Sequence, residues 1–295
     1  MNIRLLNNED TQVLEEYLAP HRAECIFICS SIKSAGINYN GADFEGEYFG
    51  FFDKNDQLQG VIVHYWNGNI MMHARDNNIL EKLISHLKTN ISRPPEGIFC
   101  PSITAEFLIK ELGISSSSFR VNRNEGLYEM NLETLNQVSL EDSMKVVVAQ
   151  DLSKNILTTW MQTYYIEALG FVNDAYLEQK VQEFWKLRLK KNDSWVLLLN
   201  GTPVALSAFR ARLEDMVQVG PVWTPPEYRN RGFARLLVNY TLQQEKLKAI
   251  KKAVLFAHNP AAIKAYVSVG FKKIRTYRIA LLAKPSGVIA SSEGQ

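Results

Sequence analysis

The residues with the clearest potential for chemistry lie between Gln218 and Phe271. A strand-like segment ends there at Pro225 and Pro226, and a helix-like segment then opens with Arg229, Asn230, Arg231, Gly232, Phe233 and Ala234. Proline cannot continue a strand ladder, and the first turn of a helix carries unpaired N–H groups at the positive end of the helix dipole. This stretch therefore predicts a site for an anion that accepts several N–H bonds at once, such as a pyrophosphate.

Small and basic residues support the anion hypothesis. Gly232 lets the backbone approach a phosphate where a Cβ would obstruct it, and Ala234 is the next smallest choice. Arg229 and Arg231 add positive charge beside the same helix start. The alternative is an ordinary helix start with two solvated arginines, and this short pattern by itself does not separate the two.

A second segment adds a candidate acid. Asn259 is a good N-cap, Pro260 a good first helical residue and Gly270 a good residue to follow a helix, so a short helix is predicted over 260–269. If this helix lies beside the preceding strand, the Tyr266 hydroxyl points toward the C-terminal edge of the sheet. The alternative for Tyr266 is a core aromatic residue.

The elements that must position these residues follow from hydrophobic periodicity and turn signals. The second half predicts a strand, two helices, a three-strand meander, a helix, a strand, a helix and closing strands. Their ranges are 144–148, 153–170, 174–191, 195–199, 203–210, 215–223, 229–248, 253–257, 260–269 and 273–282. The tail, 286–295, is predicted to be disordered.

The first half predicts the same order of elements. Strands are expected at 3–6, 47–52, 58–66, 69–73, 97–100 and 127–132, and helices at 11–18, 23–35, after Asp76 or Asn77, and at 101–113. The chain is therefore interpreted as an internal duplication in the α/β (α+β) class. Each half is expected to form a mixed, mostly antiparallel twisted sheet flanked by helices, with residues 1–136 as one domain and 137–295 as the other.

The spacing of these residues resembles the two signature motifs of the GNAT acyltransferases. The first motif is carried by Val222, Pro225, Arg229, Gly232 and Ala234, and the second by Asn259, Ala262, Ala265, Tyr266, Gly270 and Phe271. The resemblance covers roughly residues 144 to 283. It implies an N-acetyltransferase that moves an acetyl group from acetyl-CoA to a primary amine of a small molecule or peptide by direct transfer.

The resemblance also implies roles for individual residues. Backbone amides of the loop would bind the pyrophosphate, the preceding strand would pair its backbone with the pantetheine, and Asn259 would lie near the pantetheine. The implied cofactor-binding set is Val222, Trp223, Thr224, Arg229, Asn230, Arg231, Gly232, Phe233, Ala234, Arg235, Asn259 and Tyr266. Tyr266 would also act as general acid, protonating the departing thiolate.

The strand before the loop departs from the family pattern. Many members carry a glutamate there as general base, but residues 215–220 have no carboxylate in their middle. Glu214, at the start of this strand, is a candidate base, with an exposed strand-end charge as its alternative. A water chain or an amine that arrives neutral would serve instead.

The first half has the same order of elements but lacks the residues that would carry this chemistry. Where the phosphate loop should lie, residues 74–78 contain no glycine, and Asp76 would repel phosphate. Where the tyrosine should lie, the helix offers Phe107 or Ile109, which have no hydroxyl. The first half is therefore interpreted as a degenerate GNAT-like domain, and the second as the catalytic one.

Bulk properties narrow the function classes. The formal net charge of the 295 residues is +2, so neither nucleic acid nor a membrane surface is expected as a partner. Three cysteines without metal-ligand spacing indicate reduced thiols, no metal and a cytoplasmic location. No apolar run is long enough to cross a bilayer. We expect a monomer or homodimer that binds acetyl-CoA and an amine; the alternative function is a non-catalytic acyl-CoA-binding sensor or scaffold.

Overall fold

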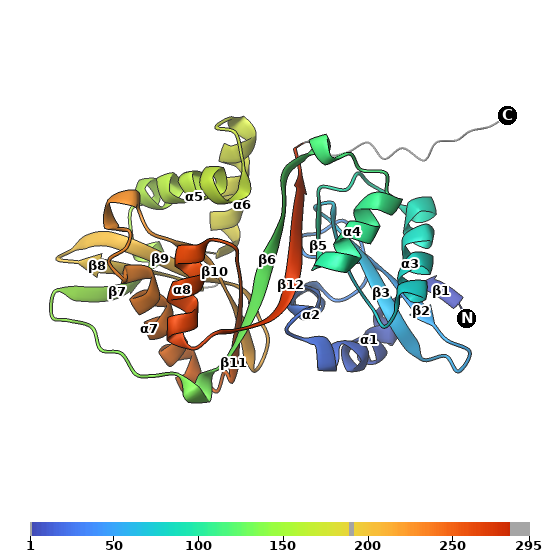
Figure 1. Ribbon diagram of the computed structural model, residues 1–295, viewed down its shortest axis with the longest axis horizontal. Coiled ribbons are helices and arrows are strands. Elements are labelled where there is room, and N and C mark those ends of the chain that lie inside the picture. The colour runs from blue at the N-terminus through green and yellow to red at the C-terminus, as the bar shows by residue number, and fades with distance from the viewer. Residues whose placement is uncertain (1, 189–191, 284–295) are drawn as a thin grey trace. The chain divides into compact units, whose positions relative to one another are not determined.

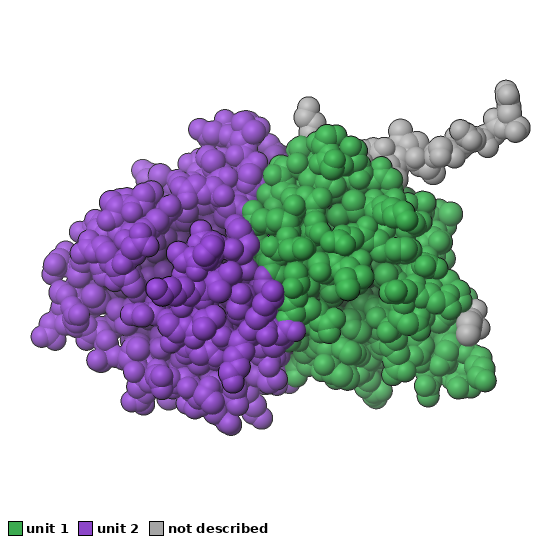
Figure 2. Space-filling view, in the orientation of Figure 1, with its two compact units in different colours: residues 1–125, 275–295 green, residues 126–274 purple. Residues whose placement is uncertain are grey.

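The computed structural model describes residues 2–188 and 192–283, and these residues form two compact units (Figure 2). Unit 1 comprises residues 2–125 and 275–283, and unit 2 comprises residues 126–274 without 189–191. No helix in these described ranges is long and apolar enough to cross a membrane. The predicted helix residues 189–191 and the predicted disordered tail lie outside the described residues.

Unit 1 contains a sheet with helices on both faces (Figure 1). Its elements, in chain order, are β1 (Asn2–Leu5), α1 (Thr11–Leu18), α2 (Ile26–Ala35), β2 (Gly46–Phe52), β3 (Leu58–Tyr65), β4 (Asn69–Ala74), α3 (Asn77–Asn90), β5 (Gly97–Pro101), α4 (Ser102–Glu111) and the start of β6 (Phe119–Asn131). One core packs under α3 and α4 around Ile62 and Ile98. A second core packs under α1 and α2 around Tyr48 and Val63.

Unit 2 repeats this order (Figure 1). Its elements are β7 (Met144–Val148), α5 (Lys154–Leu169), α6 (Ala175–Arg188), β8 (Ser194–Leu199), β9 (Thr202–Arg212), β10 (Met216–Trp223), α7 (Phe233–Leu247), β11 (Lys252–Ala257), α8 (Pro260–Val269) and the start of β12 (Lys272–Leu282). The core beneath α7 and α8 includes Val217 and Leu255, and the core beneath α5 and α6 includes Leu206 and Trp223. The predicted duplication and the tandem fold are confirmed.

Two strands each contribute to both units. Residues 126–131 of β6 pair antiparallel with β11 in unit 2, and residues 277–281 of β12 pair antiparallel with β5 in unit 1. The compact units therefore divide at 125/126 and 274/275, whereas the sequence placed the division at 136/137. The difference arises because β6 begins at Phe119 rather than at Leu127. The first half of β6 carries the charged residues Arg120, Arg123 and Glu125, so its hydrophobic pattern does not indicate a strand.

Within each unit the strands pair mostly antiparallel, as predicted. Strands follow the order β1-β2-β3-β4-β5-β12 in unit 1 and β6-β11-β10-β9-β8-β7 in unit 2. The pairs β4–β5 and β10–β11 are parallel. In each case a helix, α3 or α7, connects the two parallel strands, as parallel pairing requires.

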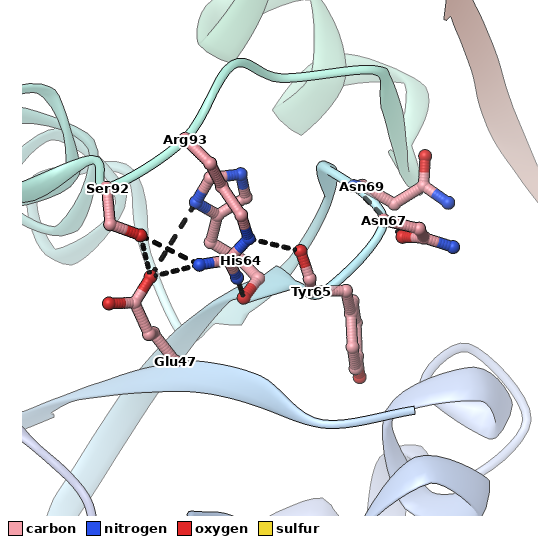
Figure 3. A network of polar contacts seen from close by, with 7 residues as sticks. All are labelled: Glu47, His64, Tyr65, Asn67, Asn69, Ser92 and Arg93. Atoms are coloured by element: carbon pink, nitrogen blue, oxygen red, sulfur yellow. Dashed lines mark hydrogen bonds and ion pairs between the residues drawn. The ribbon is translucent and has the colours of Figure 1, made fainter. Parts of the chain in front are cut away.

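A polar network ties the segment after α3 to the sheet of unit 1 (Figure 3). Arg93 donates from Nη1 to the Glu47 carboxylate at 2.7 Å, from Nε to the Tyr65 carbonyl at 2.7 Å, and from Nη2 to the His64 carbonyl. The side chain of His64 is fully buried beside them, 3.9 Å from Glu47. Burial lowers the pKa of His64 to about 3, and Arg93 contributes in the same direction, so His64 is neutral near pH 7.

Candidate active site

Strands β10 and β11 separate part-way along their length. Their parallel pairing runs from Met216 and Lys252 to Val219 and Leu255, where it ends. Beyond this point β10 continues along β9 to Trp223, while β11 continues along β6 to Ala257. Register shifts on both sides of Val219 mark the place where β10 turns away. The facing edges carry backbone groups that an extended ligand can pair with, as an added strand would.

The loop that follows β10 ends in an open helix start. After the short 3-10 turn Pro226–Tyr228, Asn230 and Gly232 adopt positive φ angles of 63° and 82°. Gly232 is the N-cap of α7 and supplies no side-chain hydrogen bond to the first turn. A Cβ built on Gly232 would meet only the Arg235 Nη2 within 4 Å, at 3.6 Å. No side chain caps the amides of this first turn, so they are available to an anion.

Arg229 has a second role that the sequence did not reveal. Its Nη2 lies 2.9 Å from the Glu167 carboxylate on α5, and its Nε donates to the Thr224 carbonyl at 3.0 Å. The guanidinium also lies 4.7 Å above the centre of the Trp223 ring. Arg229 thus fixes the start of the loop against α5 and the end of β10, and shares its charge with Glu167. No local pattern could show this pair, because 62 positions separate its members.

Two buried polar atoms at the end of β10 lack hydrogen-bond partners within the described residues. They are Trp223 Nε1 and Thr224 Oγ1. Buried donors and hydroxyls are nearly always satisfied in native proteins, so such atoms call for an explanation. A polar ligand lying along the separated strand edges supplies one.

Asn259 and Tyr266 are placed on α8 as the sequence predicted. The Asn259 side-chain oxygen accepts from the amides of Ala261 and Ala262 at 2.9 and 3.3 Å, which makes it the N-cap of α8. Tyr266 is buried in the core beneath α7 and α8, with its ring centre 6.2 Å from that of Phe271. Burial raises the pKa of Tyr266, and the Tyr164 phenol raises it further. The hydroxyl therefore keeps its proton, which suits an acid rather than a base.

Glu214 is not brought together with these residues. It lies exposed in the turn between β9 and β10, at the opposite end of β10 from Trp223. Nine residues of extended chain separate the two by roughly 30 Å. Inside the strand the polar residue is Gln218, which is buried and donates to the Val219 carbonyl at 2.6 Å. Neither residue offers a carboxylate to the opening between β10 and β11.

In unit 1 the parallel strands β4 and β5 also separate, but different residues lie at the helix start that follows β4. Pairing of β4 with β5 ends at Met71 and Phe99. Asp76 caps α3, and its carboxylate accepts from the Ile79 amide at 2.9 Å. A carboxylate of the protein thus occupies the helix start, and its charge opposes a phosphate there.

The tyrosine position of unit 1 is held by an apolar residue. Tyr266 is the seventh residue of α8, and the seventh residue of α4 is Leu108. Leu108 is fully buried, whereas Phe107 and Ile109 only flank the core. Leu108 lies between the predicted alternatives Phe107 and Ile109, and none of these three side chains carries a hydroxyl.

Comparison with known proteins agrees with this geometry. Residues 155–271 match a model of the Acetyltransferase (GNAT) family. This part of the chain is a GNAT domain. A search of curated proteins found no match.

Solved structures extend the likeness to both units. A GCN5-related N-acetyltransferase from Sphaerobacter thermophilus is 10% identical, with a TM-score of 0.60 over 95% of this chain and 94% of that chain. A tandem GNAT protein from the clavulanic acid biosynthesis pathway is 11% identical, with a TM-score of 0.56 over 97% and 99%. A GNAT-family acetyltransferase from Colwellia psychrerythraea is 15% identical, with a TM-score of 0.51 over 95% and 100%. The chain thus has a tandem GNAT fold, and its GNAT domain supports acyl-CoA-dependent acetyl transfer in general.

Proposed function

We propose that unit 2 transfers an acetyl group from acetyl-CoA directly to a primary amine of a small molecule or peptide. The observation that carries this proposal is the separation of β10 from β11 beside the uncapped start of α7. A backbone edge for an amide-rich arm and a helix start for a pyrophosphate lie at the two ends of one loop. Acetyl-CoA carries both groups, and it is the donor implied by the GNAT match.

The donor would be held mainly by backbone groups. We assign the pyrophosphate to the amides of residues 230–235, with Arg231 and Arg235 exposed beside them. The pantetheine would pair with the edge of β10 at Val222 and Thr224, next to the unpaired Trp223 Nε1 and Thr224 Oγ1. The amide nitrogen of Asn259 would face the same arm, since its oxygen is used as the cap of α8. Arg229 would hold the loop in place.

Tyr266 is assigned as the general acid. Its hydroxyl keeps its proton because burial raises its pKa, and a proton donor within hydrogen-bond reach of the sulfur stabilises the departing thiolate. In the described residues no group of three or more His, Cys, Asp or Glu side chains is arranged to hold a metal ion. We propose no metal ligand among them.

Unit 1 is proposed as the degenerate half, which binds no acyl-CoA. The capping carboxylate of Asp76 and the buried Leu108 stand where a phosphate and an acid would be needed. We also propose a cytoplasmic location, because Cys25, Cys29 and Cys100 are free thiols, and a monomer or homodimer without nucleic-acid or membrane partners.

The second candidate is an acyl-CoA sensor or scaffold without catalysis. The lack of a carboxylate in the interior of β10 favours it, because Gln218 cannot act as a base. A transfer assay distinguishes the two functions. The full-length protein is mixed with acetyl-CoA and spermidine, L-lysine, tyramine or a short peptide with a free amino terminus, and the released thiol is measured. Thiol release that depends on the amine supports the enzyme; acetyl-CoA binding without release supports the sensor.

A further inference from the structure

Unit 1 contains a cavity of about 390 Å³ between α1, the turn that connects β2 to β3, and the residue that follows β4. Its walls include Val13, Glu16 and Tyr17 of α1, Asp56 of the turn, and Arg75. All of these residues belong to unit 1. Pockets that bind small molecules in proteins span roughly 300 to 1,000 Å³, so the cavity has the size for a small ligand.

Two residues of the wall, Tyr17 and His21, are held in place by their neighbours. The Tyr17 hydroxyl donates to the Gln59 carbonyl at 3.0 Å and lies 2.8 Å from Nδ1 of His73. The ring of His21 packs on that of His73, with centres 4.0 Å apart and planes at 33°. Burial lowers the pKa of His73 to about 4, so this residue is neutral near pH 7. A wall that is already ordered needs little rearrangement to bind a ligand.

Three charged side chains line the cavity, namely Glu16, Asp56 and Arg75. Asp56 and Arg75 are exposed, and neither side chain forms a hydrogen bond or a salt bridge within residues 2–188 and 192–283. The Glu16 carboxylate accepts from Gln12 on its own helix at 2.8 Å. A guanidinium binds carboxylates in a fork geometry, and carboxylates bind ammonium groups. The walls can therefore hold one ligand group of each sign.

Arg75 differs from its counterpart in unit 2. By the order of elements, β4 corresponds to β10 and α1 corresponds to α5. Arg229, in the loop after β10, pairs with Glu167 of α5 at 2.9 Å. Arg75, directly after β4, forms no such pair within the described part of unit 1, although Glu16 of α1 lines the same cavity. The opposite charges of this cavity thus remain available to a ligand.

Apolar side chains complete the lining of the cavity. They are Val13, Pro20 and Leu58. Val13 is 40% exposed, which leaves an apolar surface beside the charged groups uncovered. A ligand that covers this surface gains from the removal of apolar area from water. The lining therefore suits a molecule with an ammonium group, a carboxylate and an apolar side chain.

We propose that this cavity binds an α-amino acid with an apolar side chain. Arg75 holds the carboxylate, and Glu16 and Asp56 hold the ammonium group. The side chain lies against Val13 and Leu58. This site gives unit 1, for which we propose no acyl-CoA, a ligand of its own. It goes beyond the proposed acetyl transfer and does not depend on it.

Titration calorimetry of the full-length protein without acetyl-CoA tests the ligand class. The probes are L-leucine, 3-methylbutylamine, which lacks only the carboxylate, and 4-methylpentanoate, which lacks only the amino group. L-leucine is expected to bind, and each of the two analogues should bind about tenfold more weakly or worse, because each loses one charge-assisted contact.

The variant Arg75→Gln tests the location of the site. It should weaken L-leucine binding by about tenfold or more and leave the binding of 3-methylbutylamine no weaker, since that probe has no carboxylate. Lys54→Gln is the matched control, because it removes the same charge from the β2–β3 turn at a residue outside the lining. Its affinity for L-leucine should equal that of the wild-type protein. Melting temperatures close to the wild-type value show that both variants are folded.

Three results would overturn the proposal. They are a wild-type protein that does not bind L-leucine, an analogue that binds as tightly as L-leucine, and an Arg75→Gln variant that binds L-leucine like the wild type or no worse than Lys54→Gln. Turnover does not enter these measurements. A protein that binds L-leucine as expected but transfers no acetyl group would therefore contradict the proposed acetyl transfer alone.

Discussion

The guanidinium of Arg229 and the carboxylate of Glu167 lie 2.9 Å apart and connect the start of the phosphate-site loop to α5. The same guanidinium covers the Trp223 ring and donates to the Thr224 carbonyl. Arg229, which the motif suggests for binding the anion, thus already contacts groups of the protein itself. The loop is held in place by this contact, while the amides of α7 remain open for the ligand.

Glu167→Gln should lower the free energy of unfolding by no more than about 1 kcal/mol, because both partners are partly exposed to solvent. The difference from wild type should shrink as salt is raised from 0.05 to about 0.5 M, since salt screens exposed pairs. Urea unfolding at the two salt concentrations measures it. Glu178→Gln on α6 is the control. A salt-independent loss larger than about 2 kcal/mol would contradict the description of the pair as exposed.

Gly232→Glu should abolish the rise in melting temperature that acetyl-CoA gives the wild-type protein. The change puts a side chain into the open space before α7 and a negative charge where the pyrophosphate would lie, at a φ of 82° that disfavours it. Gly201→Glu is a matched control, because Gly201 has a similar φ of 80° in the β8–β9 turn with open space around it. An unchanged acetyl-CoA shift in Gly232→Glu, or its loss in Gly201→Glu, would refute the loop assignment.

Tyr266→Phe should lower kcat roughly 100-fold, the usual effect of losing a positioned acid, with little change in the dissociation constant for acetyl-CoA. The ring of Tyr266 stays in the core, so packing against Phe271 is kept. Kinetics and calorimetry of the same preparation separate the two effects. Turnover equal to that of wild type would remove Tyr266 from the acid role.

One acetyl-CoA should bind per chain. Unit 2 offers an uncapped helix start, and unit 1 offers a helix start capped by Asp76. Titration calorimetry of the full-length protein gives the stoichiometry directly. Two sites per chain, with one surviving in Gly232→Glu, would show that unit 1 retains a binding site and is not degenerate.

Acid should destabilise unit 1 through His64. The folded-state pKa is about 3, below the unfolded value near 6.5, so the stabilisation is present above pH 6.5 and is lost as the pH falls toward 3. The loss is up to about 1.4 kcal/mol per pH unit for this group. His64→Leu should flatten the dependence of the melting temperature on pH between 6.5 and 5. It should not abolish it, because burial also lowers the pKa of His73 to about 4. An unchanged pH dependence would contradict the burial of neutral His64.

Much of the fold could be predicted because its signals are local. Helix α8 and strand β7 have the predicted bounds, and Asn259 and Asp76 cap the helices that they precede. Helix α7 was predicted from Arg229 but begins at Phe233, because the positive φ of Asn230 and Gly232 cannot be continued as a helix. The pairing of β6 with β11 and of β12 with β5 has no local signature, because the residue pattern of a strand does not specify which neighbouring strand it pairs with.

The residues of the candidate site also fall into those that local sequence signals predict and those that only the packing reveals. The loop, Asn259 and Tyr266 are motif residues at short spacing, and the structure places them where their local signals predict, at the start of α7, at the N-cap of α8 and within α8. Glu167 and Tyr164 reach Arg229 and Trp223 from α5, about 60 positions earlier in the chain, and only the packing of α5 on β10 reveals them. Glu214 shows the opposite case, in which proximity in sequence to β10 placed a carboxylate at the wrong end of the strand.

The central claim is that unit 2 transfers acetyl groups to amines. The most direct test incubates the full-length protein with acetyl-CoA and the amine panel and measures both the free thiol and the acetylated amine by mass spectrometry, with Gly232→Glu alongside. We predict equal amounts of thiol and acetylated amine from the wild-type protein and neither product above background from the variant. Acetyl-CoA that binds to the wild-type protein but yields no acetylated product with any amine would contradict it.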